Sequence, residues 1–181
     1  MIPPEVARRI RLLALDVDGV LTDNGIYLGP IEGQRVELKR FDIQDGLGLA
    51  VLRGTPIEVV WGSARHSEAT ALRAQELRVA VVVQDSAKKL PAMTRLLSER
   101  GLDWPEVAFV GDDLADLPVL RRVGLPIAVA NAVPEAKALA TWVTSQPGGH
   151  GAVREVVVEL LKARGEWEAA VTRYVTERGG P

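Results

Sequence analysis

The chain has 181 residues, of which 47% are apolar and 25% are charged, as in soluble globular proteins with a substantial core. Its formal net charge of −2 excludes the strongly positive surface that binds nucleic acid or anionic membranes, so we expect neither partner. The absence of cysteine excludes disulfides, thiolate nucleophiles and thiolate-bound metals, and only two histidines are present. Oxygen atoms would therefore hold any bound metal, which favours a hard cation such as Mg²⁺.

The first ten residues, MIPPEVARRI, lack the apolar stretch of a signal peptide. No apolar run reaches the roughly 18 residues that a membrane span needs. We therefore expect a cytoplasmic protein that does not enter a membrane.

Short apolar, β-branched runs alternate with helix-like segments along the chain. The runs that predict strands are 11–15, 57–61, 79–83, 107–110, 126–130 and the short 142–144. The segments that predict helices are 67–77, 88–100, 114–123, 134–139 and, near the C-terminus, 152–163 and 167–177. Strands that are apolar on both faces and alternate with helices are typical of a doubly wound parallel sheet, so we predict an α/β fold. We expect residues 1–181 to form a single domain that ends in helices over about 152–178.

One segment interrupts this alternation. Residues 26–41, IYLGPIEGQRVELKRF, read as two strands joined by a Gly-Pro…Gly turn. They predict a small β-hairpin flap beside the acidic loop that precedes them. No gap between the predicted core elements is long enough for an inserted cap domain.

Chemically active side chains follow four of the predicted strands. Since ligands of open parallel sheets bind beyond the carboxyl ends of the strands, we expect these residues to meet at one edge. They are Asp16 and Asp18 after the first strand, Ser63 and Arg65 after the second, Lys88 and Lys89 after the third, and Asp112, Asp113 and Asp116 after the fourth.

This set of side chains suits phosphoryl transfer. A carboxylate can attack phosphorus and form an aspartyl phosphate, which splits one difficult step into two. A second acid can protonate the leaving oxygen and then activate water, which explains a pair of aspartates. A divalent cation and a lysine would offset the charge on the transferred phosphoryl group.

The segments DVDGVLTD, GSAR, KKLPA and GDDLAD together resemble the four motifs of the haloacid dehalogenase superfamily. Over about 12–161, further blocks such as FDIQDGLG, VGLPIAVANA and GGHGAVREV resemble the 3-deoxy-D-manno-octulosonate 8-phosphate phosphatase family. The resemblance implies a Rossmann-like core and Mg²⁺-dependent hydrolysis of a small sugar-acid phosphate through an aspartyl phosphate.

The resemblance also implies roles for the matched residues. Asp16 would be the nucleophile and a Mg²⁺ ligand, Asp18 the acid/base that gives its backbone carbonyl to the metal, and Asp112 the third protein ligand. Ser63 would hydrogen-bond the phosphate, and Lys89 would neutralise the phosphate and the nucleophile. Asp113 and Asp116 would orient Lys89 or metal-bound water. The substrate contacts would be Asp18, Lys89, Arg65, Arg73 and, in a loop at 42–46, Asp42, Asp45 and Gly46.

Two departures from the family pattern bear on specificity. Gln44 and Ala50 stand where the family has arginines, and a lost arginine removes a bidentate partner for a carboxylate. The substrate could therefore be a related nonulosonate phosphate. Two alternatives remain: a phosphatase for another small phosphate metabolite, and a catalytically idle regulatory or binding module with this fold.

Two further expectations concern the rim of the site. The resemblance implies a ring-like homotetramer in which a neighbouring subunit, through its hairpin or its C-terminal segment, helps to wall each site. The Gly148–Gly151 stretch opens a predicted helix, so its backbone N–H groups could receive an anion, or it could be a simple connection.

Overall fold

The computed structural model describes residues 2–84 and 88–180. Within these residues the core is a parallel sheet of six strands in the order β5-β4-β1-β6-β7-β8. The strands are β1 (Leu12–Asp16), β4 (Glu58–Gly62), β5 (Val81–Val83), β6 (Val107–Gly111), β7 (Leu125–Ala128) and β8 (Trp142–Val143). This arrangement confirms the predicted doubly wound α/β fold.

Strand β1 lies at the centre of the sheet, between β4 and β6. All five of its residues are buried, as expected for a strand that is covered by helices on both faces. The chain runs outward from β1 to β5 in one direction and then from β6 to β8 in the other. The point where this order reverses is the usual ligand site of such sheets.

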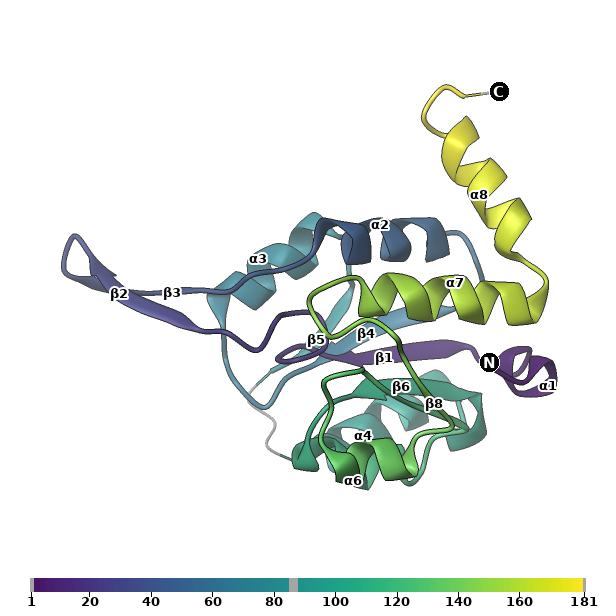
Figure 1. The fold of residues 1–181 in the computed structure, drawn as a ribbon, viewed down its shortest axis with the longest axis horizontal. Helices are drawn as coiled ribbons and strands as arrows, with labels where there is room; N and C mark the ends of the chain where they lie inside the picture. Colours follow the sequence, from purple (N-terminus) through teal and green to yellow (C-terminus); the bar gives the residue numbers. More distant parts are fainter. Residues whose placement is uncertain (1, 85–87, 181) are drawn as a thin grey trace.

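Helices cover both faces of the sheet (Figure 1). Helices α2 (Ile43–Leu52), α3 (Glu68–Glu76) and α7 (Ala152–Arg164) lie on one face, and α4 (Lys89–Arg100) and α6 (Pro134–Leu139) on the other. The remaining helical elements are α1 (Pro4–Ala7), α5 (Leu117–Leu120), α8 (Trp167–Thr176) and the 3-10 turns η1 (Trp104–Glu106) and η2 (Leu114–Asp116). Across the described part of the chain, no helix combines the length and the apolar character that crossing a membrane requires.

The predicted hairpin consists of β2 (Tyr27–Ile31) and β3 (Gln34–Leu38), and it projects beyond the sheet (Figure 1). The prediction of a Gly-Pro…Gly turn was only partly right, because Gly29 and Pro30 lie within β2 and only Gly33 lies in the turn. The chain reverses at Glu32 and Gly33, whose φ angles are 50° and 78°. Two successive positive φ angles are typical of the tight turns whose twist matches paired strands.

The prediction that residues 42–46 form a loop was also wrong, because most of them lie in a helix. The carboxylate of Asp42 accepts a hydrogen bond from the backbone N–H of Gln44, and helix α2 begins at Ile43. The sequence did not predict this helix, because it contains Gly46 and Gly48 and glycine weakens an isolated helix. Both glycines are buried where the helix packs closely, so tertiary contacts stabilise it.

Candidate active site

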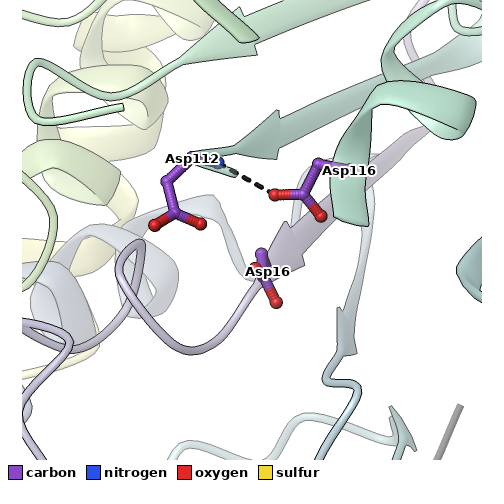
Figure 2. A group of neighbouring side chains, drawn as sticks. All are labelled: Asp16, Asp112 and Asp116. Carbon is purple, nitrogen blue, oxygen red and sulfur yellow. Dashed lines mark hydrogen bonds between the residues drawn. The ribbon is translucent and has the colours of Figure 1, made fainter. Parts of the chain in front are cut away.

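The acidic residues of the first and fourth motifs meet at the carboxyl edge of the sheet. Asp16 ends β1 and Asp112 directly follows the adjacent strand β6, so the register of the sheet brings them together (Figure 2). A hollow of about 150 Å³ opens at this edge. It is lined by Asp16, Asp18, Asn24, Ala64, Arg65, Lys89, Asp112, Asp113 and Ala115.

Asp16 is a buried carboxylate that is partly compensated by a lysine. Its Oδ1 atom accepts a hydrogen bond from the backbone N–H of Val17 at 2.7 Å and lies 2.7 Å from Nζ of Lys89. Burial raises the pKa of Asp16 well above its ordinary value, and the nearby carboxylate of Asp116 adds to this effect, while Lys89 opposes it. The site therefore holds a buried carboxylate whose charge needs further positive partners.

Lys89 begins helix α4 and lies between two carboxylates. Its Nζ atom is 2.7 Å from Asp16 and 2.6 Å from Oδ1 of Asp116. Burial alone would lower the pKa of Lys89, but the two carboxylates outweigh burial and raise it, so the lysine stays charged. The other oxygen of Asp116 accepts the backbone N–H of Asp112 at 2.9 Å, so Asp116 is placed to orient Lys89.

The acidic cluster fits a divalent cation. Oxygen atoms of Asp16, Asp112 and Asp116 lie within 4.8 Å of one another. Oδ1 of Asp112 is buried and has no hydrogen-bond partner among the described residues. Burial raises the pKa of Asp112 to about 7, and the neighbouring Asp116 and Asp113 contribute to the rise. A cation beside Asp112 would satisfy this oxygen and offset the crowded charge, and carboxylate oxygens are the ligands that Mg²⁺ prefers.

Gly19 explains why a glycine follows the two aspartates of the first motif. Its φ is +87°, and a Cβ atom there would collide with the carboxylate of Asp112. Glycine therefore allows the loop to pass close to the carboxylate of Asp112.

Asp18 is held by two side chains from other parts of the chain. The hydroxyl of Ser63, just after β4, donates to its Oδ2 atom at 3.2 Å. Nζ of Lys39, just after β3, donates to its Oδ1 atom at 2.6 Å. Sequence reasoning missed Lys39. Side chains two residues apart in an extended chain point to the same face, so Lys39 could have been expected on the face of the hairpin that carries Glu37.

Comparison with known proteins agrees with this geometry. A model of the haloacid dehalogenase-like hydrolases matches residues 64–156. The 3-deoxy-D-manno-octulosonate 8-phosphate phosphatase of Escherichia coli strain K12 is 42% identical over 164 residues, covering 91% of this chain and 86% of that protein. The chain belongs to this phosphatase family of the haloacid dehalogenase superfamily.

Solved structures of the phosphatase family share the fold. The enzyme from Moraxella catarrhalis, in complex with a magnesium ion, a phosphate ion and a KDO molecule, has a TM-score of 0.89 and 36% identity. That match covers 94% of this chain and 97% of the other. The cobalt-bound enzyme from Haemophilus influenzae has a TM-score of 0.83 and 32% identity, over 91% and 94% of the two chains. These bound ions agree with a divalent cation as the cofactor of the acidic cluster.

Several residues that the family resemblance assigned to substrate make contacts within the protein in this structure. Asp42 caps α2, and its backbone carbonyl accepts a hydrogen bond from Arg73 of α3 at 3.2 Å. Gly46 gives Arg73 room, because a Cβ atom there would lie 2.6 Å from its guanidinium. Arg65 lines the hollow and pairs with Glu37 of the hairpin at 3.0 Å. Asp113, which the resemblance assigned to orienting Lys89 or metal-bound water, caps η2 by accepting the N–H of Leu114 at 2.6 Å.

Asp45 caps the N-terminus of α7 from inside the protein. Its carboxylate is 1% exposed and accepts the backbone N–H groups of Arg154 at 2.8 Å and Gly151 at 3.4 Å. Burial raises the pKa of Asp45 to about 6, although these hydrogen bonds oppose the rise. In a single subunit, this residue joins α2 to α7.

The Gly148–Gly151 stretch packs against the loop that follows β1. A Cβ atom on Gly148 would collide with the carbonyl of Gly19, and the N–H of Gly149 donates to the carbonyl of Val20 at 2.9 Å. The N–H of Gly148 donates to Asn131 and that of Gly151 to Asp45. These donors are used within the protein, so the structure does not favour the anion-binding interpretation.

Proposed function

We propose that this enzyme is a Mg²⁺-dependent phosphatase that hydrolyses 3-deoxy-D-manno-octulosonate 8-phosphate or a closely related sugar-acid phosphate. The observation that carries the proposal is the buried Asp16, with Lys89 at 2.7 Å and Asp112 beside it, at the switch point of the sheet. The relatives' names support the substrate class.

The side chains support a two-step reaction. Asp16 attacks phosphorus and forms an aspartyl phosphate, while Asp18 protonates the departing sugar oxygen. Asp18 then takes a proton from water as the water attacks the phosphoenzyme, which frees phosphate and restores Asp16. Lys89 and the hydroxyl of Ser63 stabilise the charge on the phosphoryl oxygens. Asp16 and Asp112 would hold a divalent cation, which would supply further positive charge to the reaction.

The choice among sugar acids depends on the rim of the site. Gln44 and Ala50 both lie on α2, six positions apart. At 100° per residue their side chains diverge by about 120°, so one subunit cannot aim both at the same ligand. We therefore expect the differences from the family pattern at Gln44 and Ala50 to affect two different contacts. A nonulosonate phosphate remains the second candidate substrate.

A substrate panel tests the proposed function. Phosphate release is measured with octulosonate 8-phosphate, a nonulosonate 9-phosphate, a hexose phosphate and a nucleotide, each with Mg²⁺ and with excess chelator. We expect the highest kcat/KM for one of the two sugar acids, and no turnover in chelator. A preference for the hexose phosphate or the nucleotide would favour another phosphate metabolite. No turnover of any compound with Mg²⁺ would favour the idle module.

The hairpin supports a proposal of a homotetramer. Directly paired residues share a face, so Tyr27 and Leu38 lie on one face with Val36 and Ile31. Tyr27, Ile31 and Leu38 are 60%, 59% and 58% exposed. On the opposite face, Glu37 pairs with Arg65 beside the enzyme's own active site. An isolated hairpin is marginally stable in water, and pairing with hairpins of other copies would bury its apolar face.

Light scattering tests the assembly. We expect a tetrameric mass for the active enzyme, and a smaller mass with reduced turnover for a Tyr27→Ser, Ile31→Ser double variant. A fully active monomer would contradict the proposal. The composition and the chemistry of a small soluble metabolite favour the cytoplasm as the place of this reaction.

A further inference from the structure

Lys39 is a buried lysine outside the recognised motifs. It follows β3, the second strand of the hairpin, and its side chain is fully buried although most of that strand is exposed. Its Nζ atom lies 2.6 Å from Oδ1 of Asp18, 3.4 Å from the hydroxyl of Thr70 and 3.7 Å from Glu37. A buried ammonium is costly unless it is paired, so this placement needs a specific partner.

A closed ring of contacts links Asp18 to Ser63, Arg65, Glu37 and Lys39. Ser63 donates to one Asp18 oxygen at 3.2 Å, and the N–H of Arg65 donates to Ser63 at 3.1 Å. The guanidinium of Arg65 pairs with Glu37 at 3.0 Å, and Glu37 faces Lys39, which returns to Asp18. The ring therefore connects the catalytic loop, the loop after β4 and the base of the hairpin.

Phosphate binding changes the balance within this ring. Ser63 has one hydroxyl proton, which it gives to Asp18 in this structure. If that proton turns to a phosphate oxygen, as the proposed reaction requires, Ser63 no longer donates to Asp18. Lys39 then remains as the cation that fixes the position of the Asp18 carboxylate.

We propose that Lys39 is a positioning residue for hydrolysis: it holds the carboxyl group of Asp18 toward the oxygen of the leaving group and so connects the hairpin to the acid/base. The inference rests on the proposed function, because it assigns Lys39 to the proton-transfer part of that reaction. It adds a required residue that lies in none of the four motifs.

The choice of leaving group separates this role from a purely structural one. A sugar alkoxide leaves poorly without a proton, whereas p-nitrophenolate leaves readily as an anion. A residue that positions the acid therefore matters much more for a sugar phosphate than for p-nitrophenyl phosphate. A residue that only supports the hairpin or the phosphate site affects both substrates alike.

The experiment compares wild type, Lys39→Met and Lys39→Arg on the best sugar phosphate and on p-nitrophenyl phosphate, with saturating Mg²⁺. For Lys39→Met we expect kcat/KM on the sugar phosphate to fall at least about tenfold, and kcat/KM on the aryl phosphate to fall less than about threefold. The comparison uses kcat/KM because this ratio covers the steps up to departure of the leaving group, whereas kcat also includes hydrolysis of the phosphoenzyme, which is common to both substrates. Lys39→Arg keeps the positive charge and should recover part of the lost kcat/KM. Lys162→Met, which removes an exposed lysine of α7, is the matched control.

Two results would overturn the inference: wild-type kcat/KM in Lys39→Met on the sugar phosphate, or an equal loss of kcat/KM on both substrates. If Lys39→Met does not fold, Lys39→Arg decides the question through the same ratio of losses. Wild-type turnover is measured in parallel, so failure of the proposed function would appear there and would not be mistaken for failure of this inference.

Discussion

Asp16 at the end of β1 and Lys89 at the start of α4 form a buried ion pair, with 2.7 Å between Oδ1 and Nζ. Asp116 holds the lysine from the other side at 2.6 Å. This contact places one positive charge among several crowded carboxylates. Burial and neighbouring carboxylates raise the pKa values of Asp16 and Asp112, so their negative charges are unfavourable here, and a divalent cation beside them would relieve this cost.

Removing the charge of Asp16 should end turnover without unfolding the enzyme. In Asp16→Asn, the amide cannot attack phosphorus, so we expect kcat to fall by at least about a thousandfold. The metal-free variant should unfold at the wild-type temperature or above it, because the carboxylate that is lost was costly to bury. Calorimetry and a phosphate-release assay on the same sample check both parts, and a sharply lower unfolding temperature would contradict the second.

Removing the charge of Lys89 should have the opposite effect on stability. Lys89→Met leaves Asp16 and Asp116 buried without their shared cation, and breaking a buried pair costs about 3–5 kcal/mol. Urea unfolding of metal-free protein measures this loss. Lys162→Met, at an exposed pair with a 3.6 Å contact, should change stability by less than about 0.5 kcal/mol. Equal effects of the two variants would show that the buried pair is not important for stability.

Asp45 should make the stability of the enzyme depend on pH. Its pKa rises from 3.8 to about 6 on folding, so the folded state binds its proton more tightly than the unfolded state does. The free energy of unfolding should therefore fall as pH rises from about 4 to about 6, by up to about 3 kcal/mol. Above that window the contribution of Asp45 should stay constant.

Asp45→Asn isolates this contribution. The variant should lose the Asp45 part of the decline between pH 4 and pH 6, while its amide oxygen still accepts one backbone N–H of α7. The measurement is urea unfolding of both proteins across this range, with saturating Mg²⁺ to hold the carboxylates of the acidic cluster. An identical pH dependence in the two proteins would refute this explanation.

Gly148 should matter for catalysis although it contacts no substrate in the proposed reaction. A methyl group at this position would collide with the carbonyl of Gly19, in the loop that carries Asp18. We expect Gly148→Ala to lose about 1–3 kcal/mol of stability and at least about tenfold in kcat. At Gly62 an added methyl group meets no atom within 4 Å, so Gly62→Ala is a control for stability. Full activity of Gly148→Ala would mean that the loop tolerates displacement.

The sequence predicted the sheet and the acidic edge well, for a physical reason. Strands β1 and β6 are apolar on both faces and end at Asp16 and just before Asp112, so strand order alone places these carboxylates together. The lysine of the third motif, Lys89, was also expected near the phosphate. The catalytic and binding roles assigned to these residues remain predictions that the variants above test.

Other features depended on contacts between distant parts of the chain. Helix α2 is stabilised by packing against α7 and by the Asp42 cap, and its glycines concealed it. Lys39 directly follows the mostly exposed strand β3, and its side chain is buried because it pairs with Asp18 at the base of the hairpin. Asp45 was assigned to substrate from the family pattern, yet in this structure its hydrogen bonds go to the N-terminus of α7.

The most direct test of the account is to trap the phosphoenzyme. Enzyme that is turning over octulosonate 8-phosphate with Mg²⁺ is quenched in acid, digested, and analysed by mass spectrometry for a phosphoryl group on aspartate. The account predicts the group on Asp16, at a higher level in Asp18→Asn if that variant slows hydrolysis of the intermediate, and its absence from Asp16→Asn. Wild-type turnover by Asp16→Asn, or a phosphoryl group on another residue, would contradict it.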